Sequence, residues 1–201
     1  MTVLYTTVEK EAHSEQIIEK SKFIAHIKPV QTKEEAEAFI AQICKQYKDA
    51  THNVPAYVIG DKKQLQWASD DGEPQGTSGA PIVQMLIKED LTNICVVVTR
   101  YFGGIKLGTG GLVRAYTSSA KLAINEAGIF PVHDSIELVT EIPYNQLGKL
   151  QNLEKEKPFT IGKIEFADSL TVHIFCESEE LENTKNLLIE ITKGKFQKNA
   201  K

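Results

Sequence analysis

Cysteine is scarce in this chain of 201 residues, which contains only Cys44, Cys95 and Cys176. Neighbouring cysteines are more than fifty positions apart, so no pair has the short spacing of a metal-binding or redox motif. An odd number of cysteines also argues against a framework of disulfide bonds. We therefore expect three reduced cysteines in the core of the protein and no thiolate metal site.

Long apolar runs are also absent from the chain. No segment approaches the roughly 20 apolar residues that cross a bilayer, and the N-terminal stretch MTVLYTTVEKEAHSE lacks the basic and apolar regions of a signal peptide. The histidines are dispersed, without partners at three- or four-residue spacing, so a histidine metal site is not expected. These absences predict a cytoplasmic protein that has no membrane contact and needs no metal or cofactor.

Acidic side chains are missing from one part of the chain, although the chain as a whole is acidic. The formal net charge is −4, which argues against an indiscriminate binder of polyanions. Residues 91–125 nevertheless contain no aspartate or glutamate and carry Arg100, Lys106, Arg114 and Lys121, a formal charge of +4. The positive field of the protein is therefore expected to be local.

The composition is that of an ordinary globular protein. Apolar residues make up 41% of the chain, which is enough to bury the core of one large domain or two small ones. A capping box of Thr32 and Glu35 begins a predicted helix that ends near Tyr47. Further helices are predicted at residues 78–88 and 112–126, and strands at residues 2–11, 22–30, 54–60, 63–69 and 94–99, the last buried on both faces.

The pattern changes near His133, and we expect two domains, residues 1–133 and 134–201. Strands are expected at SIELVTEI, FTIGKIEF, LTVHIFC and, as a last edge strand, GKFQ. One helix is expected from Tyr144 and another between Glu179 and Ile191. The order β-α-β-β-α-β within about 65 residues is that of the ferredoxin-like unit, in which two helices cover one face of an antiparallel sheet.

A glycine-rich segment, residues 100–114, is the first candidate site. It follows a buried strand and leads into a helix, so several backbone N–H groups should remain unpaired at the helix start and attract an anion. The motif is neither a Walker A loop nor a complete GxGxxG, so a phosphate or polyanion cradle without nucleotide hydrolysis is expected. The alternative is a tight turn with solvated basic side chains. The candidate residues are Arg100, Gly103, Gly104, Lys106, Gly108, Gly110, Gly111 and Arg114.

An acidic loop, residues 70–79, is the second candidate site. Three carboxylates within four positions could hold a cation or supply an acid and a base, and a serine at a helix start could act as a nucleophile with a histidine base. The alternative is a turn in which Ser78 caps the next helix. The residues of this possible secondary site are His52, Asp70, Asp71, Glu73 and Ser78.

Four motifs of the chain resemble those of the IMPACT family, in its bacterial, YigZ-like branch. They are SKFIA at 21–25, ATHNVPAY at 50–57, DDGEPQGTSGAP at 70–81 and VVVTRYFGGIKLGTGGLVRAY at 96–116. The resemblance implies an α+β protein whose N-terminal domain is an α/β sandwich like domain 2 of ribosomal protein S5. It also implies a ferredoxin-like C-terminal domain like domain V of elongation factor G.

The family resemblance also bears on function. It implies a role in translation and the response to stress, because eukaryotic relatives restrain the kinase that lowers translation initiation during amino-acid starvation, through protein contacts. It carries over no catalytic residue. Our leading hypothesis is therefore a non-enzymatic regulator that binds RNA or a ribosome-associated protein through the glycine-rich segment.

Two other hypotheses remain open from the sequence. One is a small hydrolase or phosphate-handling enzyme that uses the acidic loop and His52. The other is a protein-interaction module whose apolar contact surface is formed by Tyr101, Phe102, Ile105 and Leu107. The exposure of Phe102 distinguishes this third hypothesis from a core position.

Overall fold

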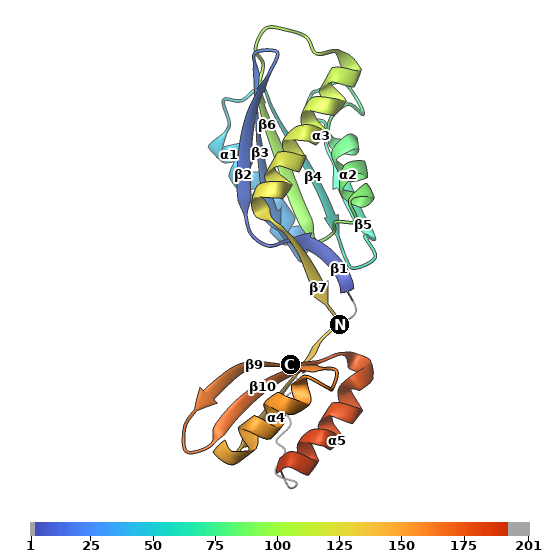
Figure 1. Cartoon of the computed structure of the whole chain (residues 1–201). Helices are drawn as coiled ribbons and strands as arrows, with labels where there is room; N and C mark the ends of the chain where they lie inside the picture. Colours follow the sequence, from blue (N-terminus) through green and yellow to red (C-terminus); the bar gives the residue numbers. More distant parts are fainter. Residues whose placement is uncertain (1–2, 193–201) are drawn as a thin grey trace. The chain divides into compact units, whose positions relative to one another are not determined.

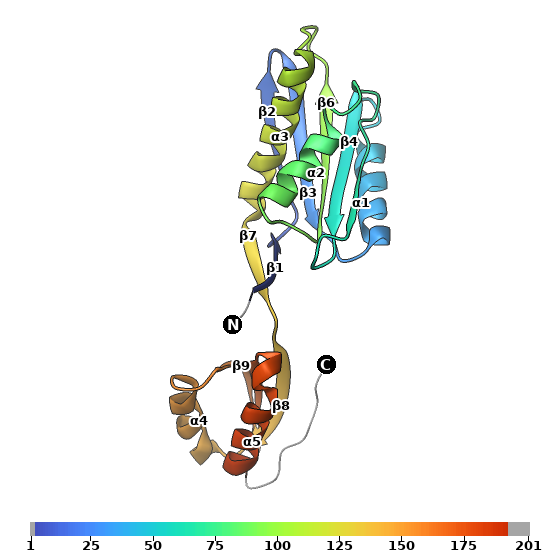
Figure 2. The same cartoon turned by 90° about the vertical axis from the view of Figure 1, so that its right-hand side faces the viewer.

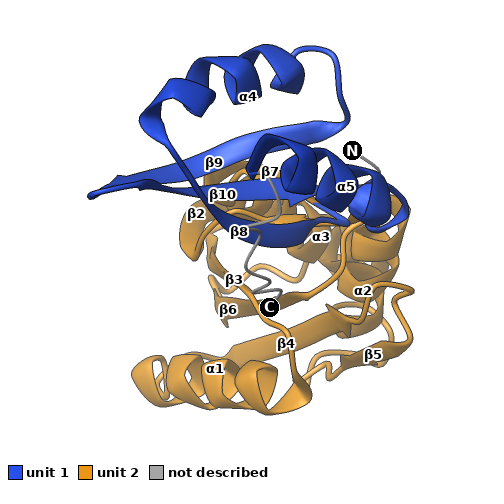
Figure 3. Ribbon diagram, turned by 90° about the horizontal axis from the view of Figure 1, so that it is seen from below, with its two compact units in different colours: residues 1–3, 133–201 blue, residues 4–132 orange. Residues whose placement is uncertain are grey.

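The computed structural model describes residues 3–192, which form two compact units (Figure 3). The N-terminal unit is residues 4–132, and the C-terminal unit consists of residues 133–192 together with residue 3. Both units contain antiparallel strands and helices, so the fold class is α+β with two domains, as the sequence predicts. No helix within the described range has the length and hydropathy of a membrane span.

A five-stranded antiparallel sheet forms the framework of the N-terminal unit (Figure 1). Its central strand β6 is apolar on both faces, because Val96 and Val98 pack in one core cluster and Cys95 and Val97 in another. The predicted buried strand at 94–99 is therefore confirmed. In spatial order the strands are β2 (Ala12–Ile18), β3 (Ser21–Pro29), β6 (Ile94–Tyr101), β4 (His52–Ile59) and β5 (Leu65–Ala68).

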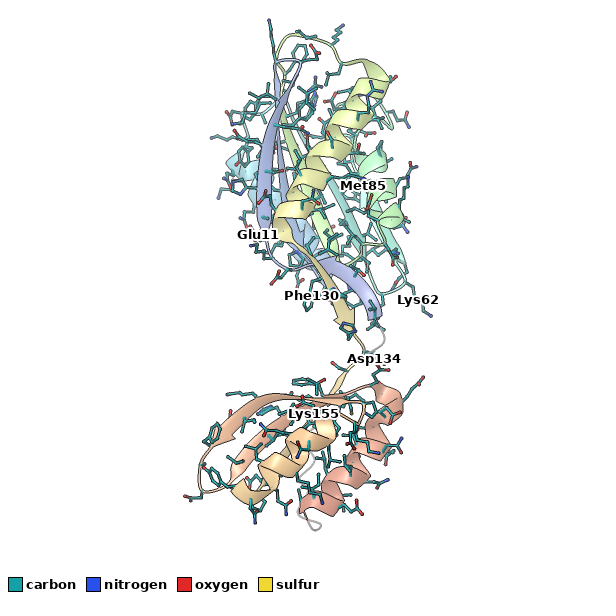
Figure 4. The ribbon with its side chains drawn as sticks, viewed as in Figure 1. Glu11, Lys62, Met85, Phe130, Asp134 and Lys155 are labelled. Atoms are coloured by element: carbon teal, nitrogen blue, oxygen red, sulfur yellow. The ribbon has the colours of Figure 1, made fainter. Side chains whose placement is uncertain are left out.

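Helices cover both faces of this sheet (Figure 2). Helices α2 (Gly79–Lys88) and α3 (Gly108–Ala127) pack on one face, where Met85 of α2 belongs to the larger core cluster (Figure 4). Helix α1 (Lys33–Gln46) packs on the other face through residues that include Phe39 and Ile43. The predicted cap of α1 is confirmed, because Thr32 Oγ1 accepts a hydrogen bond from the backbone N–H of Glu35 at 3.2 Å.

Three features of the N-terminal unit differ from the sequence prediction. The strand expected at residues 2–11 is present as the shorter strand β1 (Val3–Val8), and β2, which follows it at Ala12–Ile18, was not predicted. Strand β1 pairs with β7 (Ile129–His133), which was not predicted. Helix α3 begins at Gly108 rather than near Leu112, so three of the glycines that were expected in a loop form its first turn.

The C-terminal unit places two helices against a three-stranded antiparallel sheet of order β8-β10-β9. Its core is a separate apolar cluster that includes Leu138, Leu150, Ile174 and Leu188. The expected edge strand GKFQ lies outside the described residues. The elements are β8 (Ile136–Ile142), η1 (Tyr144–Gln146), α4 (Leu147–Glu154), β9 (Phe159–Phe166), β10 (Leu170–Cys176), η2 (Ser178–Glu180) and α5 (Leu181–Thr192).

Candidate functional site

A pocket of about 440 Å³ lies in the N-terminal unit, between the start of α3 and the acidic loop. Both sequence-predicted sites contribute to it. Sheet pairing brings them together, because His52 at the start of β4 lies opposite Arg100 at the end of β6. The lining residues are Thr51, His52, Glu73, Pro74, Arg100, Phe102, Lys106, Leu107, Gly108, Thr109 and Leu112.

The start of α3 supplies one wall of the pocket. Within residues 3–192, no side chain caps this helix start, and its first turn contains no acidic residue. Gly104 and Gly108 have positive φ angles of 86° and 70°, which only glycine adopts without strain. The amide groups of the first turn therefore leave a partial positive charge at the pocket.

Two exposed cations lie at this helix start. Lys106 lines the pocket directly. The guanidinium of Arg114 lies beside Gly110, because its Nη1 would be 3.8 Å from a Cβ atom added at that glycine. Lys106 and Arg114 are therefore both placed where they can attract an anion from solvent.

Arg100 differs from the expected open cation. It is 4% exposed, and its Nη1 donates to Glu73 Oε1 at 2.6 Å in a buried ion pair. Its guanidinium also lies between two aromatic rings, 5.4 Å from the centroids of both Phe23 and Phe102. The expectation that Arg100 adds an open positive charge is therefore wrong, because the carboxylate that neutralises it comes from the acidic loop.

Glu73 is the centre of a buried polar network. Besides Arg100, its Oε1 accepts a hydrogen bond from the hydroxyl of Tyr116 at 2.7 Å. Burial, together with this bond to a carboxylate, raises the pKa of Tyr116 and keeps its hydroxyl protonated. Tyr116 is a part of the site that sequence reasoning missed, because its spacing in α3 indicates only a core position.

His52 approaches the same carboxylate from β4. Its Nε2 lies 3.9 Å from Glu73 Oε1, beyond hydrogen-bond distance. Its Nδ1 lies 2.7 Å from the backbone oxygen of Asp71, which can only accept, so Nδ1 carries the proton. In the neutral ring Nε2 is then an acceptor that faces the carboxylate.

Asp70 and Ser78 do not line the pocket. Asp70 caps α2, since its Oδ1 accepts from the Ser78 hydroxyl at 2.6 Å and from the Gly79 amide at 2.9 Å, and its Oδ2 from the Gly76 amide at 2.7 Å. Burial raises the pKa of Asp70, but these hydrogen bonds outweigh it and lower the pKa overall. Ser78 is fully buried with its hydroxyl donated to Asp70, so this geometry does not prepare it as a nucleophile.

Asp71 has a structural contact. Its Oδ2 accepts from the Asn53 backbone N–H at 2.6 Å, which fastens the acidic loop to the start of β4. Residues 3–192 contain no group of three histidine, cysteine, aspartate or glutamate side chains that could hold a metal ion. The acidic loop therefore contributes to the pocket mainly by positioning Glu73.

The apolar residues of the glycine-rich segment are partly open to solvent. Phe102 is 46% exposed and Ile105 is 37% exposed, whereas Tyr101 and Leu107 are half-buried. The exposure of Phe102 is what the third hypothesis requires. The backbone N–H of Phe102 donates to Thr51 Oγ1 at 3.0 Å, which fixes the aromatic residue at the edge of the pocket.

Comparisons with known proteins cover both units. Residues 19–124 match the family model described as the Impact N-terminal domain, and residues 140–195 match a domain of unknown function, DUF1949. The chain is 42% identical to the Bacillus subtilis protein "IMPACT family member YvyE" over 191 residues, which are 95% of this chain and 88% of that protein.

Two further comparisons agree with these matches. The Escherichia coli protein "IMPACT family member YigZ" is 37% identical over 139 residues, which are 68% of each chain. A solved structure titled "Crystal structure of an hypothetical protein" superposes with a TM-score of 0.64 at 28% identity, over 96% of this chain and 95% of the other.

Proposed function

The chain belongs to the IMPACT family, and from this premise we propose that it is a non-enzymatic, translation-associated regulator that binds RNA through the glycine-rich segment. One observation carries the proposal. In a protein of net charge −4, the uncapped start of α3 lies beside two exposed cations, Lys106 and Arg114. The translational role rests on the family resemblance, and the choice of RNA rests on this geometry.

Phosphate is the ligand chemistry that suits such a helix start. Unpaired N–H groups and the helix dipole favour an anion, and glycines let it approach the backbone closely. Exposed lysine and arginine side chains add attraction at longer range, which a polyanion exploits at several phosphates at once. An exposed aromatic ring such as Phe102 is typical of surfaces that bind single-stranded RNA, because unpaired bases stack on it.

The experiment measures the affinity of the full chain for a fluorescent single-stranded RNA oligomer as a function of salt. We expect the double variant Lys106→Gln, Arg114→Gln to lower affinity at least tenfold at low salt, and to reduce the slope of log affinity against log salt by about one to two units. The matched control is Lys62→Gln, Lys88→Gln, in which Lys62 (labelled in Figure 4) lies in the turn after the end of β4. His52 lies at the opposite, first position of that strand. Equal affinities for the two double variants would refute RNA binding at this segment.

A protein partner is the second candidate, and the exposure of Phe102 and Ile105 favours it. An apolar contact of this kind would survive nuclease treatment and high salt, whereas binding through phosphates would not. Capture of partners from a lysate with and without nuclease, at two salt concentrations, separates the two candidates.

The hydrolase hypothesis gains no support, because Ser78 is buried and His52 Nε2 lies 3.9 Å from Glu73.

A further inference from the structure

We propose that the pocket at the start of α3 receives a single nucleotide unit. Its phosphate binds the first turn of α3, its base stacks on Phe102, and its N–H or O–H donors face His52. The inference rests on the proposed function, since it names the part of an RNA ligand that the site takes. The shared chemistry is a nucleoside phosphate, whether part of an RNA chain or free.

The size of the cavity supports one unit rather than a strand. Its volume of about 440 Å³ lies within the range of roughly 300–1,000 Å³ that is typical of small-ligand sites. An extended RNA strand needs an open groove, and the remainder of such a strand would pass over the exposed residues Lys106 and Arg114. The pocket itself is suited to one base with its phosphate.

The donors of the pocket lie on the α3 side and at Arg100. The uncapped amides of the first turn and the ammonium group of Lys106 can all donate hydrogen bonds to a ligand. Arg100 is a second indication that the pocket takes a ligand. It lines the pocket, and its buried Nε–H has no hydrogen-bond acceptor within residues 3–192. A buried donor without an acceptor is unfavourable, and a small rearrangement that brings a ligand oxygen to it would satisfy it.

A hydrogen-bond acceptor lies on the opposite wall of the pocket. Glu73 Oε1 already accepts from Arg100 and Tyr116, whereas His52 Nε2, 3.9 Å from that oxygen, is an acceptor in the neutral ring. A ligand donor that reaches His52 Nε2 would satisfy it. The amino and imino groups of a base, or a ribose hydroxyl, provide such donors, whereas inorganic phosphate at neutral pH does so poorly.

Phe102 provides the flat apolar surface between these polar groups. One face of its ring lies over the Arg100 guanidinium, which is itself held by Glu73 and by stacking on Phe23. The ring is 46% exposed, so a base can stack on its open side. Because Arg100 already fixes the ring, stacking requires little additional ordering of the protein.

The experiment is calorimetric titration of the full chain with the four nucleoside 5′-monophosphates, with adenosine, with ribose 5-phosphate and with inorganic phosphate. We expect each monophosphate to bind at least tenfold more tightly than its parts, with purines ahead of pyrimidines because their rings stack over a larger area. Phe102→Ala should weaken the monophosphates about fivefold or more and leave inorganic phosphate unchanged, while Phe102→Tyr should retain binding.

The control variant is Phe130→Ala, which removes a similarly exposed phenylalanine from β7 (Figure 4). It should leave every affinity unchanged, and circular dichroism confirms that each variant is folded. Inorganic phosphate that binds as tightly as the monophosphates would overturn the inference, as would full nucleotide affinity in Phe102→Ala.

A second experiment distinguishes a free nucleotide from a nucleotide unit of RNA as the ligand. It also distinguishes a failure of the nucleotide pocket from a failure of the proposed function. The RNA oligomer is measured with and without a 5′-phosphate, in competition with the monophosphates. Competition between them supports a shared pocket. RNA binding that needs Lys106 and Arg114 but is unaffected by nucleotides overturns the nucleotide pocket and leaves the proposed function standing. Nucleotide binding without RNA binding overturns the proposed function and leaves the nucleotide pocket standing.

Discussion

At the scale of single residues, His26 is a buried histidine outside the candidate site. It lies in β3 and is 6% exposed, with its ring 6.2 Å from that of His13 and 4.8 Å from that of Tyr47. Burial, and secondly the charge of His13, lower the pKa of His26 from 6.5 to about 4. The folded protein therefore keeps this side chain neutral at pH values where an unfolded chain would protonate it.

This difference predicts a pH dependence of stability. Between pH 6.5 and 4 the unfolded state binds the proton and the folded state does not, so the free energy of unfolding falls as the pH falls through this window. The shift corresponds to a loss of up to about 3 kcal/mol. Denaturant unfolding at pH 7, 5.5 and 4 should show this loss in the native chain and a smaller one in His26→Gln. An NMR titration of His26 with a midpoint near its ordinary value would contradict the prediction.

At the scale of elements, the loop between β6 and α3 crosses the β2–β3 turn in close contact. A Cβ atom at Gly103 would lie 2.0 Å from the backbone carbonyl of Lys20, and the Gly103 N–H donates to Ser21 Oγ at 3.1 Å. This contact holds the glycine-rich segment over the end of the sheet. Glycine is required at this position for space, whereas Gly104 and Gly108 are required for their positive φ angles.

Gly103→Ala should therefore destabilise the protein by at least about 1–3 kcal/mol, because backbone atoms rather than a flexible side chain must move. The matched control is Gly148→Ala in α4, where an added Cβ meets no atom within 4 Å. A helical glycine in open space should gain about 0.5–1 kcal/mol from alanine. Thermal and denaturant unfolding measure both changes. Similar stabilities of the two variants would be inconsistent with the close contact.

The elements also show what the sequence could predict. Strand β6 and helix α1 were predicted because their apolar spacing and the Thr32 cap are local signals. The start of α3 was placed too late because glycine is a poor helix former, although it is tolerated in a first turn. Strand β2 was missed because its inward face carries the polar residues Ser14 and Gln16, which breaks the alternation of apolar and polar residues, and only pairing with β3 defines it.

The candidate site was predictable only in its parts. The glycine-rich segment and His52 were found from composition and motifs, but their meeting in one pocket depends on the β4–β6 register that sets His52 opposite Arg100. The count of charges along the chain could not reveal that Glu73 neutralises Arg100, because the two residues are 27 positions apart. Contacts between residues that are far apart in the chain cannot be deduced from a single sequence.

At the scale of the whole molecule, the chain has separate hydrophobic cores in its two units. Both clusters around the five-stranded sheet consist of residues before residue 128, and the third cluster begins at Leu138. Among residues 3–192, those that line the candidate pocket all belong to the N-terminal unit. Packing in the C-terminal unit should therefore be dispensable for the pocket, because no residue is shared between its core and the other two clusters.

This separation predicts that a core substitution lowers local stability only in the unit that contains it. Ile174→Ala leaves a cavity beside Leu138 and Leu188 and should lower the stability of the C-terminal unit by about 2–5 kcal/mol. Hydrogen exchange, followed by mass spectrometry, should then quicken in β10 and α5 and remain unchanged in β6, and affinity at the pocket should remain that of the native chain. The reciprocal variant Leu86→Ala, on the buried face of α2, should quicken exchange in β6 and leave β10 protected. Faster exchange in both units from either single substitution would mean that the two cores unfold as one cooperative unit, and the independence argued from the packing would be wrong.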